Sequence, residues 1–404
     1  MNNQNQVRTE ILVSIITIGF IIALFSKYVQ GAYLHMDFPF NTFLFAPDDR
    51  FRDFYGPYVQ AQNLEAYINK PGLVISQYFP FLYLLLYPFT FLEMHTASYL
   101  FSAIFYTLAI AISWLYISKL THIKTFASKA TTTAVFTLMN YGMLFCFDRG
   151  NVEIIVYLLL CIAFLFFLKN NIKIFSLFII LATMVKPYIG LYSIILIDLK
   201  DKKTIISYFK FLFMLVIVFF SMMLIFNGKF IDNNSTLYNN LVLVKNMYDA
   251  KIMLFYSVSI LEPIKYFISE QSSELTTKIH MFITIPTFII SCLLVTLIPK
   301  MVWHKVTIIT CMLVCLTPVA FDYKLLMFMV PIFLFITSDE IESSRISYLY
   351  SIFFGLIIIP KDYYYFPELN ATSIQVLLNP ILIYILILFL WYEMVKKLKF
   401  TSKI

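Results

Sequence analysis

Charged side chains are concentrated in one short stretch, APDDRFRDFYGPY at residues 46–58, of a chain in which only 13% of residues are charged. The stretch holds three aspartates and two arginines within six consecutive positions. Carboxylates can act as general bases, and arginines can hold a phosphate through two parallel hydrogen bonds. The candidate catalytic residues are therefore Asp53, Asp49 and Asp48, and the candidate anion-binding residues are Arg50 and Arg52.

Each of these residues also has a structural explanation. Asp53 opens an aromatic segment and is expected to be the catalytic base, although aspartate is equally favoured as a helix N-cap. Asp48 and Asp49 fit a turn and a cap as well as a catalytic site. They would also suit magnesium or manganese, but two loop carboxylates are too common a pattern, so no metal or other cofactor is assigned. Arg50 and Arg52 either bind phosphate or neutralise the neighbouring aspartates.

The elements that must position these residues are membrane helices. Hydrophobic residues make up 60% of the chain, and apolar runs of roughly 17–25 residues, long enough to span a bilayer as helices, recur along it. The run that begins at Ile11 has no basic region beyond Arg8 and no small-residue cleavage site after it, so we expect a retained helix rather than a signal peptide. The five cysteines lie in apolar runs and are expected to be core residues.

The loop charges orient the chain in the membrane. The apolar segment 78–92 contains two prolines and is too short to cross comfortably, so we expect it to lie at the membrane surface. All short lysine clusters then fall on the side of both termini, which the positive-inside rule assigns to the cytoplasm. The net charge of +7 is explained by these lysines of the short loops, so no nucleic acid is expected as a partner. About twelve spans result, near residues 11–28, 97–118, 128–147, 151–168, 172–185, 188–199, 204–226, 280–298, 305–319, 323–337, 346–360 and 378–395.

The sequence thus predicts an all-α polytopic membrane protein that forms a single integral-membrane domain, residues 1–404. Two large segments are expected outside the cytoplasm, a first loop at 29–96 with the acidic stretch and a second loop at 227–279. The short outer turns carry few charges, and such charges are costly near a bundle interior unless they are paired or functional.

Two outer turns carry candidates of this kind. Arg149 precedes Gly150-Asn151 at a helix start, where an arginine and backbone N–H groups can grip an anion together; the alternative is a surface pair with Asp148. Lys186 lies at the Lys186-Pro187 tip of a predicted helical hairpin and either contacts phosphate or extends to the membrane surface. Glu153 either stabilises the helix dipole or contributes to the site, and it is left out of the expected site residues.

A third group interrupts an apolar stretch near the end of the chain. Asp322 and Lys324, with Tyr323 between them, are expected to line the substrate site. The cluster KDYYYFP at 361–367 is expected to belong to an interfacial aromatic belt, with sugar stacking as the alternative.

Four segments, taken in order, resemble the membrane-embedded C-fold glycosyltransferases, and most closely glycosyltransferase family 87. DFYGPYVQAQNL (53–64) followed by YFPFLYLLLYPF (78–89) is similar to that family's acidic first outer loop. DRGNVEIIVYLLL (148–160) looks like its Gly-Asn helix start, and LATMVKPYIGL (181–191) resembles its lysine–proline hairpin. LTPVAFDYKLLMFMVP (316–331) is similar to its late Pro–Asp–Tyr helix. Phe79-Pro80-Phe81 departs from the double proline of the family.

The resemblance implies a transferase that moves a sugar from a polyprenyl-phosphate-linked donor to a hydroxyl group of a glycan or glycolipid acceptor. The reaction would take place on the outer face of a bacterial cytoplasmic membrane, in cell-envelope polysaccharide or glycolipid synthesis. It needs a carboxylate base and cations around the leaving phosphate. The expected catalytic carboxylates are Asp53, Asp49 and Asp48, and the expected substrate- and phosphate-binding residues are Arg50, Arg52, Arg149, Asn151, Lys186, Asp322 and Lys324.

Two other functions stay open at this point. An O-antigen or capsule repeat-unit polymerase is also rich in aromatic residues and would use the large loop 227–279, although that loop contains no arginine. A flippase or transporter for lipid-linked saccharides would show inverted repeats and charges deep within its spans. The charges of this chain cluster instead at the outer ends of the predicted helices.

Overall fold

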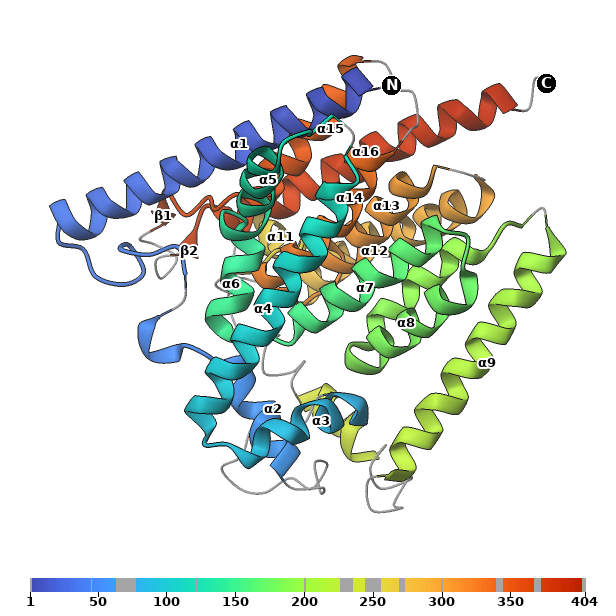
Figure 1. Cartoon of the computed structure of the whole chain (residues 1–404), viewed down its shortest axis with the longest axis horizontal. Helices are drawn as coiled ribbons and strands as arrows, with labels where there is room; N and C mark the ends of the chain where they lie inside the picture. Colours follow the sequence, from blue (N-terminus) through green and yellow to red (C-terminus); the bar gives the residue numbers. More distant parts are fainter. Residues whose placement is uncertain are drawn as a thin grey trace.

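The computed structural model describes an almost entirely helical chain (Figure 1). The described residues are 2–44, 46–62, 78–120, 122–199, 201–225, 235–243, 256–268, 273–298, 301–338, 344–366 and 372–401. Within them, the strands are β1 (Tyr365–Phe366) and β2 (Thr372–Ser373), which pair antiparallel.

Among the described residues, five helices are long and apolar enough to cross a membrane, for which about 20 residues are needed. They are α1 (Asn2–Tyr28) with its π-helical continuation η1 (Val29–Tyr33), α4 (Met94–Ser118), α9 (Lys202–Ile225), α12 (Ser273–Leu297) and α16 (Gln375–Thr401). The bent pair α5 (Phe126–Leu138) and α6 (Tyr141–Arg149) would make a sixth span if it is counted as one.

The remaining helices are shorter. The apolar ones are α3 (Pro80–Leu86) with η3 (Tyr87–Phe91), α7 (Glu153–Leu168), α8 (Ile172–Val185), η4 (Pro187–Leu196), α13 (Val302–Cys315) and α15 (Ser344–Ile358). The others are η2 (Pro47–Asp49), α2 (Arg52–Gln62), α11 (Leu261–Ile268), η5 (Asp322–Phe328) and α14 (Met329–Thr337). Apart from the two-residue strands β1 and β2, the described chain is helical, as expected of an all-α membrane protein. The expected number of about twelve spans is not confirmed.

Several predicted spans are not continuous α-helices. The run 128–147 is divided into α5 and α6, which meet at 58°. The side chain of Asn140 accepts a hydrogen bond of 3.0 Å from the backbone N–H of Met143 and so begins a new helix. The run 323–337 begins as the 3-10 helix η5, and the second arm of the predicted hairpin is the 3-10 helix η4. Hydropathy detects apolar runs but not the continuity of a helix.

The segment 78–92 forms a short helical turn instead of a span. α3 and η3 have 7 and 5 residues, and a rise of about 1.5 Å per residue falls well short of the roughly 30 Å hydrocarbon core. α2 holds this segment, because the Tyr83 hydroxyl donates to Gln60 Oε1 at 2.9 Å and the Tyr58 hydroxyl donates to the carbonyl of Leu92 at 2.6 Å. Its expected place at the membrane surface stays a prediction.

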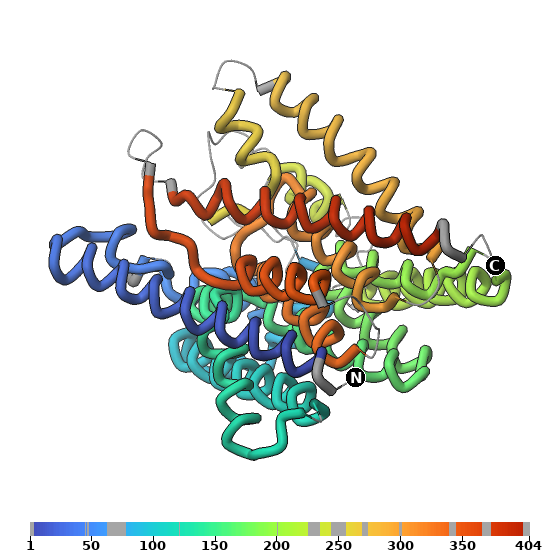
Figure 2. The backbone as a smooth tube through the Cα atoms, turned by 90° about the horizontal axis from the view of Figure 1, so that it is seen from above, coloured from blue at the N-terminus to red at the C-terminus, as the bar shows by residue number. Residues whose placement is uncertain are grey.

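The two ends of the described chain lie on the same side of the molecule. In Figure 1 the start of α1 and the end of α16 are at the top, whereas α2 and α3 lie at the bottom. Figure 2 shows α15 between α1 and α16. A Cβ atom on Gly19 of α1 would lie 2.6 Å from Ile359 Cδ1, so a small residue is needed for the close approach of α1 to the end of α15. The assignment of this side to the cytoplasm stays a prediction.

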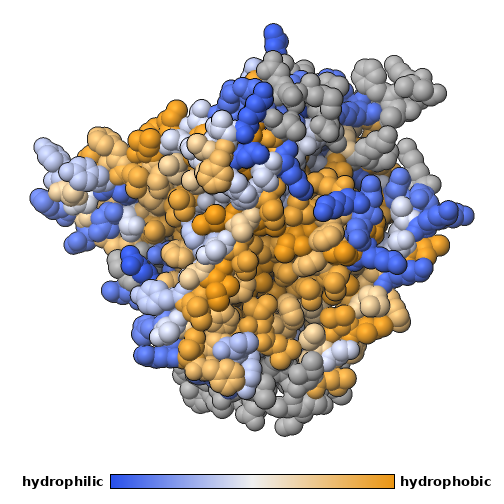
Figure 3. Space-filling view, viewed as in Figure 1, coloured by the Kyte–Doolittle hydropathy of each residue, from blue (hydrophilic) through white to orange (hydrophobic). Residues whose placement is uncertain are grey.

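Exposed apolar surface is extensive. A broad hydrophobic area covers the centre of the face in Figure 3, and hydrophilic residues gather toward its edges. Only 6% of the most apolar window of α9 is buried, and its exposed side chains include Ile206, Phe209, Phe213, Phe220 and Leu224. Soluble monomers rarely expose apolar area on this scale, whereas a lipid-facing helix requires it.

Gly142 lets α6 and η5 approach at backbone distance. A Cβ atom on this residue would lie 2.5 Å from the backbone nitrogen of Leu326 and 2.8 Å from the carbonyl carbon of Leu325. Because both are backbone atoms, a change of side-chain rotamer cannot relieve the overlap. The contact fixes η5, which carries Lys324, against α6, which carries Arg149.

We expect Gly142→Ala to destabilise the protein by about 1–3 kcal/mol, because overpacking of a buried contact forces backbone shifts. The measurement is the Tm of the purified protein in detergent. Gly190→Ala is the control, since its Cβ atom would meet only the side chain of Thr183, at 3.3 and 3.5 Å. Equal losses of Tm in the two variants would contradict the close approach of α6 and η5.

Candidate functional site

Both oxygens of the Asp53 carboxylate are bound by the turn that joins α6 to α7. Arg149 Nη2 donates to Oδ1 at 2.6 Å, which is also an ion pair, and Asn151 Nδ2 donates to Oδ2 at 2.7 Å. Arg149 Nη1 donates to the backbone carbonyl of Asp49 at 3.2 Å. One guanidinium group therefore ties the acidic stretch to the α6–α7 turn.

Gly150 allows the α6–α7 turn to take its shape. Its φ of 60° and ψ of 34° lie in the left-handed region, which glycine adopts without steric cost. The turn packs closely on the acidic stretch, because the backbone N–H of Phe51 donates to the carbonyl of Asp148 at 2.9 Å. A Cβ atom on Gly150 would lie 3.0 Å from Phe54 Cβ. The Gly-Asn helix start is thus the docking point for α2.

Arg50 and Arg52 lie on the outside of this arrangement. Arg52 Nη1 is 3.0 Å from Asp49 Oδ1, and Arg50 Nε is 3.6 Å from Asp148 Oδ1. The side chain of Arg50 is 64% exposed and that of Arg52 is 69% exposed, whereas that of Arg149 is 11% exposed. Exposed ion pairs of this kind contribute little to stability. The charges therefore divide into a shielded pair, Asp53 with Arg149, and a solvated outer set.

The carboxylates of Asp48 and Asp49 are of the type that binds magnesium or manganese. Asp48 is exposed, and Asp49 is engaged by the neighbouring arginines. Throughout the described part of the chain, no group of three or more His, Cys, Asp or Glu side chains could hold a metal ion. The structure adds no further ligand to the pair, and no metal is assigned.

Lys186 and Lys324 converge from two other elements, and both rest on tyrosine rings. Lys186 Nζ lies 4.8 Å from the ring centre of Tyr78 and 5.9 Å from that of Tyr323, and it hydrogen-bonds to the Tyr78 side chain. Lys324 Nζ lies 4.7 Å from the ring centre of Tyr188. Ring faces attract cations without neutralising them. Among the described residues neither lysine forms an ion pair with a carboxylate, so both charges stay available to a ligand.

Glu153 of α7 is a third charged residue near the lysine pair. It is fully buried; Oε1 accepts a hydrogen bond from the Tyr188 hydroxyl, and Oε2 has no hydrogen-bond partner within the described ranges. Both Lys186 and Lys324 lie within electrostatic range of it. An unpartnered buried acceptor costs about 1–3 kcal/mol, so this oxygen requires an explanation.

An electrostatic interaction links the Asp53 carboxylate to Lys186. Burial by itself lowers the pKa of Lys186, but Tyr78, Glu153 and Asp53 outweigh that effect and raise the pKa above its usual value. Asp53 is therefore close enough to act on Lys186 electrostatically. Of the predicted residues, the structure brings together Asp53, Arg149, Asn151, Lys186 and Lys324.

Asp322 makes its contacts elsewhere, although it is only two residues from Lys324. Its Oδ2 accepts from the Tyr141 hydroxyl at 2.8 Å and from Gln375 Nε2 at 2.6 Å. Burial and the nearby Asp362 raise its pKa well above the usual range. Asp322 thus joins η5 to α6 and α16, and its partners are not the tyrosines that carry the lysine pair.

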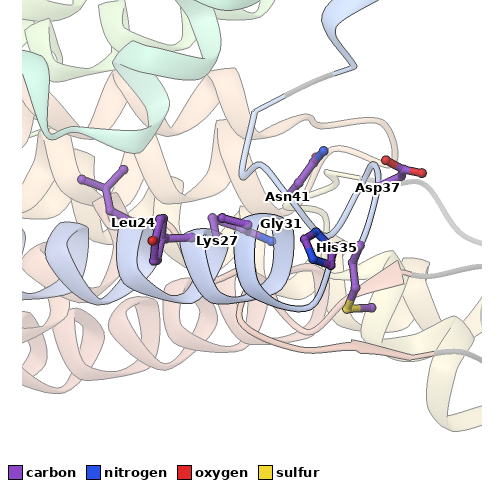
Figure 4. Close-up of a pocket in the computed structure, with 9 residues that line it drawn as sticks. Leu24, Lys27, Gly31, His35, Asp37 and Asn41 are labelled. Atoms are coloured by element: carbon purple, nitrogen blue, oxygen red, sulfur yellow. The ribbon is translucent and has the colours of Figure 1, made fainter.

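A pocket of about 550 Å³ lies where the chain turns back at the end of α1 (Figure 4). Lys27 lines it and donates to the Tyr365 hydroxyl at 2.8 Å. The other lining residues are Leu24, Tyr28, Gly31, Ala32, His35, Met36, Asp37 and Asn41. Because no predicted site residue is among them, the pocket adds nothing to the chemistry of Asp53.

The sequence analysis missed Tyr78 and Tyr188 and left out Glu153. Tyr188 follows the Lys186-Pro187 tip and Tyr323 precedes Lys324, so a tyrosine next to a lysine at a helix end was a usable signal. Tyr78 offered none, since only the fold brings it to the lysine. Glu153 was explained by the helix dipole, which accounts for its position on α7 but not for its burial.

A known protein family matches the central part of the chain. Glycosyltransferase family 87 matches residues 77–316, a range that includes Tyr78, Arg149 and Lys186, while Asp53 and Lys324 lie outside it. No match was found among curated proteins or among solved structures. Because the family match covers more than half of the chain, the resemblance is confirmed: the chain belongs to glycosyltransferase family 87 and is a membrane glycosyltransferase.

Proposed function

We propose that the protein transfers a sugar from a polyprenyl-phosphate-linked donor to a hydroxyl group of a glycan or glycolipid acceptor. The observation that carries this proposal is a carboxylate, Asp53, that is fixed at both oxygens and lies within electrostatic range of Lys186, which in turn lies within range of Lys324. Neither lysine has a carboxylate in ion-pair contact among the described residues, and each rests on a tyrosine ring. A base and a pair of cations for a phosphate are the groups that such a transfer requires.

In the proposed reaction, Asp53 accepts the proton of the acceptor hydroxyl while that oxygen forms a bond to the anomeric carbon. The bond between the anomeric carbon and the phosphate oxygen breaks, and the phosphate leaves with the electron pair. Lys186 and Lys324 stabilise the leaving phosphate, which needs no general acid. Arg149 and Asn151 orient the Asp53 carboxylate, and each of its oxygens keeps a lone pair for the acceptor.

The surroundings of the site suit a lipid-linked donor. The short apolar elements α3 and η3 lie next to it, and Phe79 packs on Phe219 of the lipid-facing helix α9, with ring centres 4.9 Å apart. A prenyl chain would stay in the hydrocarbon while its phosphate reaches the lysines.

The proposal places the site on the outer face of a bacterial cytoplasmic membrane, with both termini in the cytoplasm and a role in cell-envelope polysaccharide or glycolipid synthesis. It retains the single membrane domain with outer loops 29–96 and 227–279; residues 63–77, 226–234, 244–255 and 269–272 lie outside the described residues.

The test is sugar transfer by the purified protein in lipid nanodiscs. Radiolabelled polyprenyl-phosphate hexoses are supplied together with an extract of envelope glycans and glycolipids. We expect label to move to the acceptor fraction far faster than in protein-free nanodiscs. Transfer from sugar nucleotides, with none from any polyprenyl-phosphate hexose, would overturn the proposed donor class.

Asn151→Ala should lower kcat on the order of tenfold, because a hydrogen bond to a charged group contributes about 1.5–3 kcal/mol. The variant loses the 2.7 Å bond to Asp53 Oδ2 and also the 2.9 Å bond that Asn151 Oδ1 accepts from the backbone N–H of Glu153. The measurement is steady-state transfer alongside Tm.

Asn171→Ala is the matched control for this prediction. It loses the corresponding bond at the start of α8, where Asn171 Oδ1 accepts from the backbone N–H of Ile174 at 3.2 Å. Loss of such a cap costs about 1 kcal/mol, so both variants should lower Tm. A similar fall in kcat for both would assign Asn151 to stability alone.

A further inference from the structure

Glu153 is a fully buried carboxylate that the proposed reaction does not use. Its Oε2 has no hydrogen-bond partner among the described residues. Two lysines, Lys186 and Lys324, nevertheless lie within electrostatic range of the side chain. Buried carboxylates are normally paired or hydrogen-bonded at both oxygens. A helix-dipole role would be served equally well by an exposed side chain, so the burial of Glu153 points to another function.

We propose that Glu153 is a positioning residue: its negative charge keeps Lys186 and Lys324 charged and directed at one point before the donor phosphate arrives. Its hydrogen bond also fixes the tyrosine ring on which Lys324 rests. The inference rests on the proposed function, in which these two lysines bind the phosphate of the donor.

The two lysines repel each other. Lys186 and Lys324 come from different elements and lie within electrostatic range of each other, and each rests on tyrosine rings. Two like charges in a shielded site disfavour one another's charged form. Until a phosphate binds, a nearby negative charge is needed to hold both ammonium groups in place, and Glu153 is within electrostatic range of each.

Tyr188 connects Glu153 to Lys324. The Tyr188 hydroxyl donates to Glu153 Oε1, and the ring of Tyr188 lies 4.7 Å from Lys324 Nζ. Lys324 Nζ donates to two neutral groups, Thr317 Oγ1 at 3.2 Å and the carbonyl of Val319 at 3.3 Å. Neutral partners fix the position of the lysine but leave its charge uncompensated. The compensating charge comes from Glu153.

The Glu153 charge affects the pKa of Lys324. Lys324 lies outside the candidate membrane spans, and burial lowers its pKa to about 8; Glu153 opposes this change and Lys186 adds to it. Loss of the Glu153 charge would lower the pKa of Lys324 further, so the lysine would lose its proton at lower pH. The other titratable groups that face the three charges are Tyr188 and Tyr192 of η4, Cys146 of α6, Asp53 of α2, Tyr323 of η5, and Tyr78.

The first test is the pH dependence of kcat/KM for Glu153→Gln. Glutamine keeps the size of the side chain and can still accept the hydrogen bond from Tyr188, so charge is the main change. We expect the alkaline limb of the profile to move about one pH unit lower, so that kcat/KM for the donor falls about twofold near pH 7 and about tenfold at pH values well above the pKa of Lys324. Glu153→Asp should restore part of the shift. An alkaline limb that superimposes on that of the unmodified protein would overturn the inference.

The second test requires no substrate and stands apart from the proposed reaction. Tm in detergent is measured for Glu153→Gln, Lys324→Met and the double variant. If Glu153 balances the lysines, the double variant should be more stable than the sum of the single losses predicts, because removing one lysine removes the need for the counter-charge. Should Glu153→Gln fail to fold, recovery of folding in the double variant supports the inference. Additive losses, or a double variant that fails while Lys324→Met folds, would overturn it even if transfer from polyprenyl-phosphate sugars is observed.

Discussion

Replacing Asp53 with asparagine is expected to lower kcat by about 10²–10⁴-fold, because an amide cannot accept the proton of the acceptor hydroxyl. Asparagine retains the size of the side chain, and its oxygen can still accept the hydrogen bond that Arg149 donates at 2.6 Å in the unmodified protein. The fold should therefore persist while turnover is lost. The measurement is steady-state transfer from a polyprenyl-phosphate sugar, with the donor KM determined separately.

Asp148→Asn is the control for this result. Asp148 lies in the turn that binds Asp53, but its carboxylate faces the exposed Arg50 at 3.6 Å. The same change of acid to amide should leave most of the activity. Full turnover by Asp53→Asn would show that Asp53 is not the base, although membership of the family would stand.

Replacing Lys186 with methionine is expected to lower kcat/KM for the donor by about 10²–10³-fold, the range found when one group that stabilises developing charge is removed. Methionine keeps the length and apolar character of the lysine stem, so the packing on Tyr78 can be retained. Lys186→Arg keeps the charge and should recover part of the loss. The readout is the dependence of rate on donor concentration.

Lys361→Met supplies the matched control for Lys186→Met. Lys361 is also a buried lysine, but its Nζ donates to the carbonyl of Ile359 at 2.9 Å and lies in the network of Asp322 and Asp362. Its loss should lower Tm and leave the donor KM in place. If both variants weakened the use of the donor equally, Lys186 would have no special relation to the phosphate.

Loop charges and helix lengths predict that several charged residues lie on one side of the membrane, and that side stays a prediction. The sequence analysis placed Asp53, Arg149 and Lys186 on one face because the positive-inside rule orients every connection at once. The structure brings these residues into one site. A local sequence pattern does not show which side chains turn toward solvent, as those of Arg50 and Arg52 do, and the expected role of these two arginines in phosphate binding stays a prediction.

The residues that could not be predicted depend on packing between distant elements. Glu153 and Tyr188 are 35 positions apart and meet only because η4 folds back beside α7. The approach of Gly142 to Leu326 is equally invisible in the sequence, because it requires the path of η5. Breaks such as the one at Asn140 fall within apolar runs, where hydropathy stays high whether or not the helix continues.

The site is assembled from segments that are far apart in the chain, with Asp53 near its beginning and Lys324 near its end. A ribosome therefore produces the carboxylate long before the second lysine. A nascent chain that stalls before η5 contains Asp53, Arg149 and Lys186 but cannot form the complete cation pair. Incomplete translation products would therefore lack one lysine of the proposed phosphate-binding pair, and activity would depend on synthesis of the chain through η5.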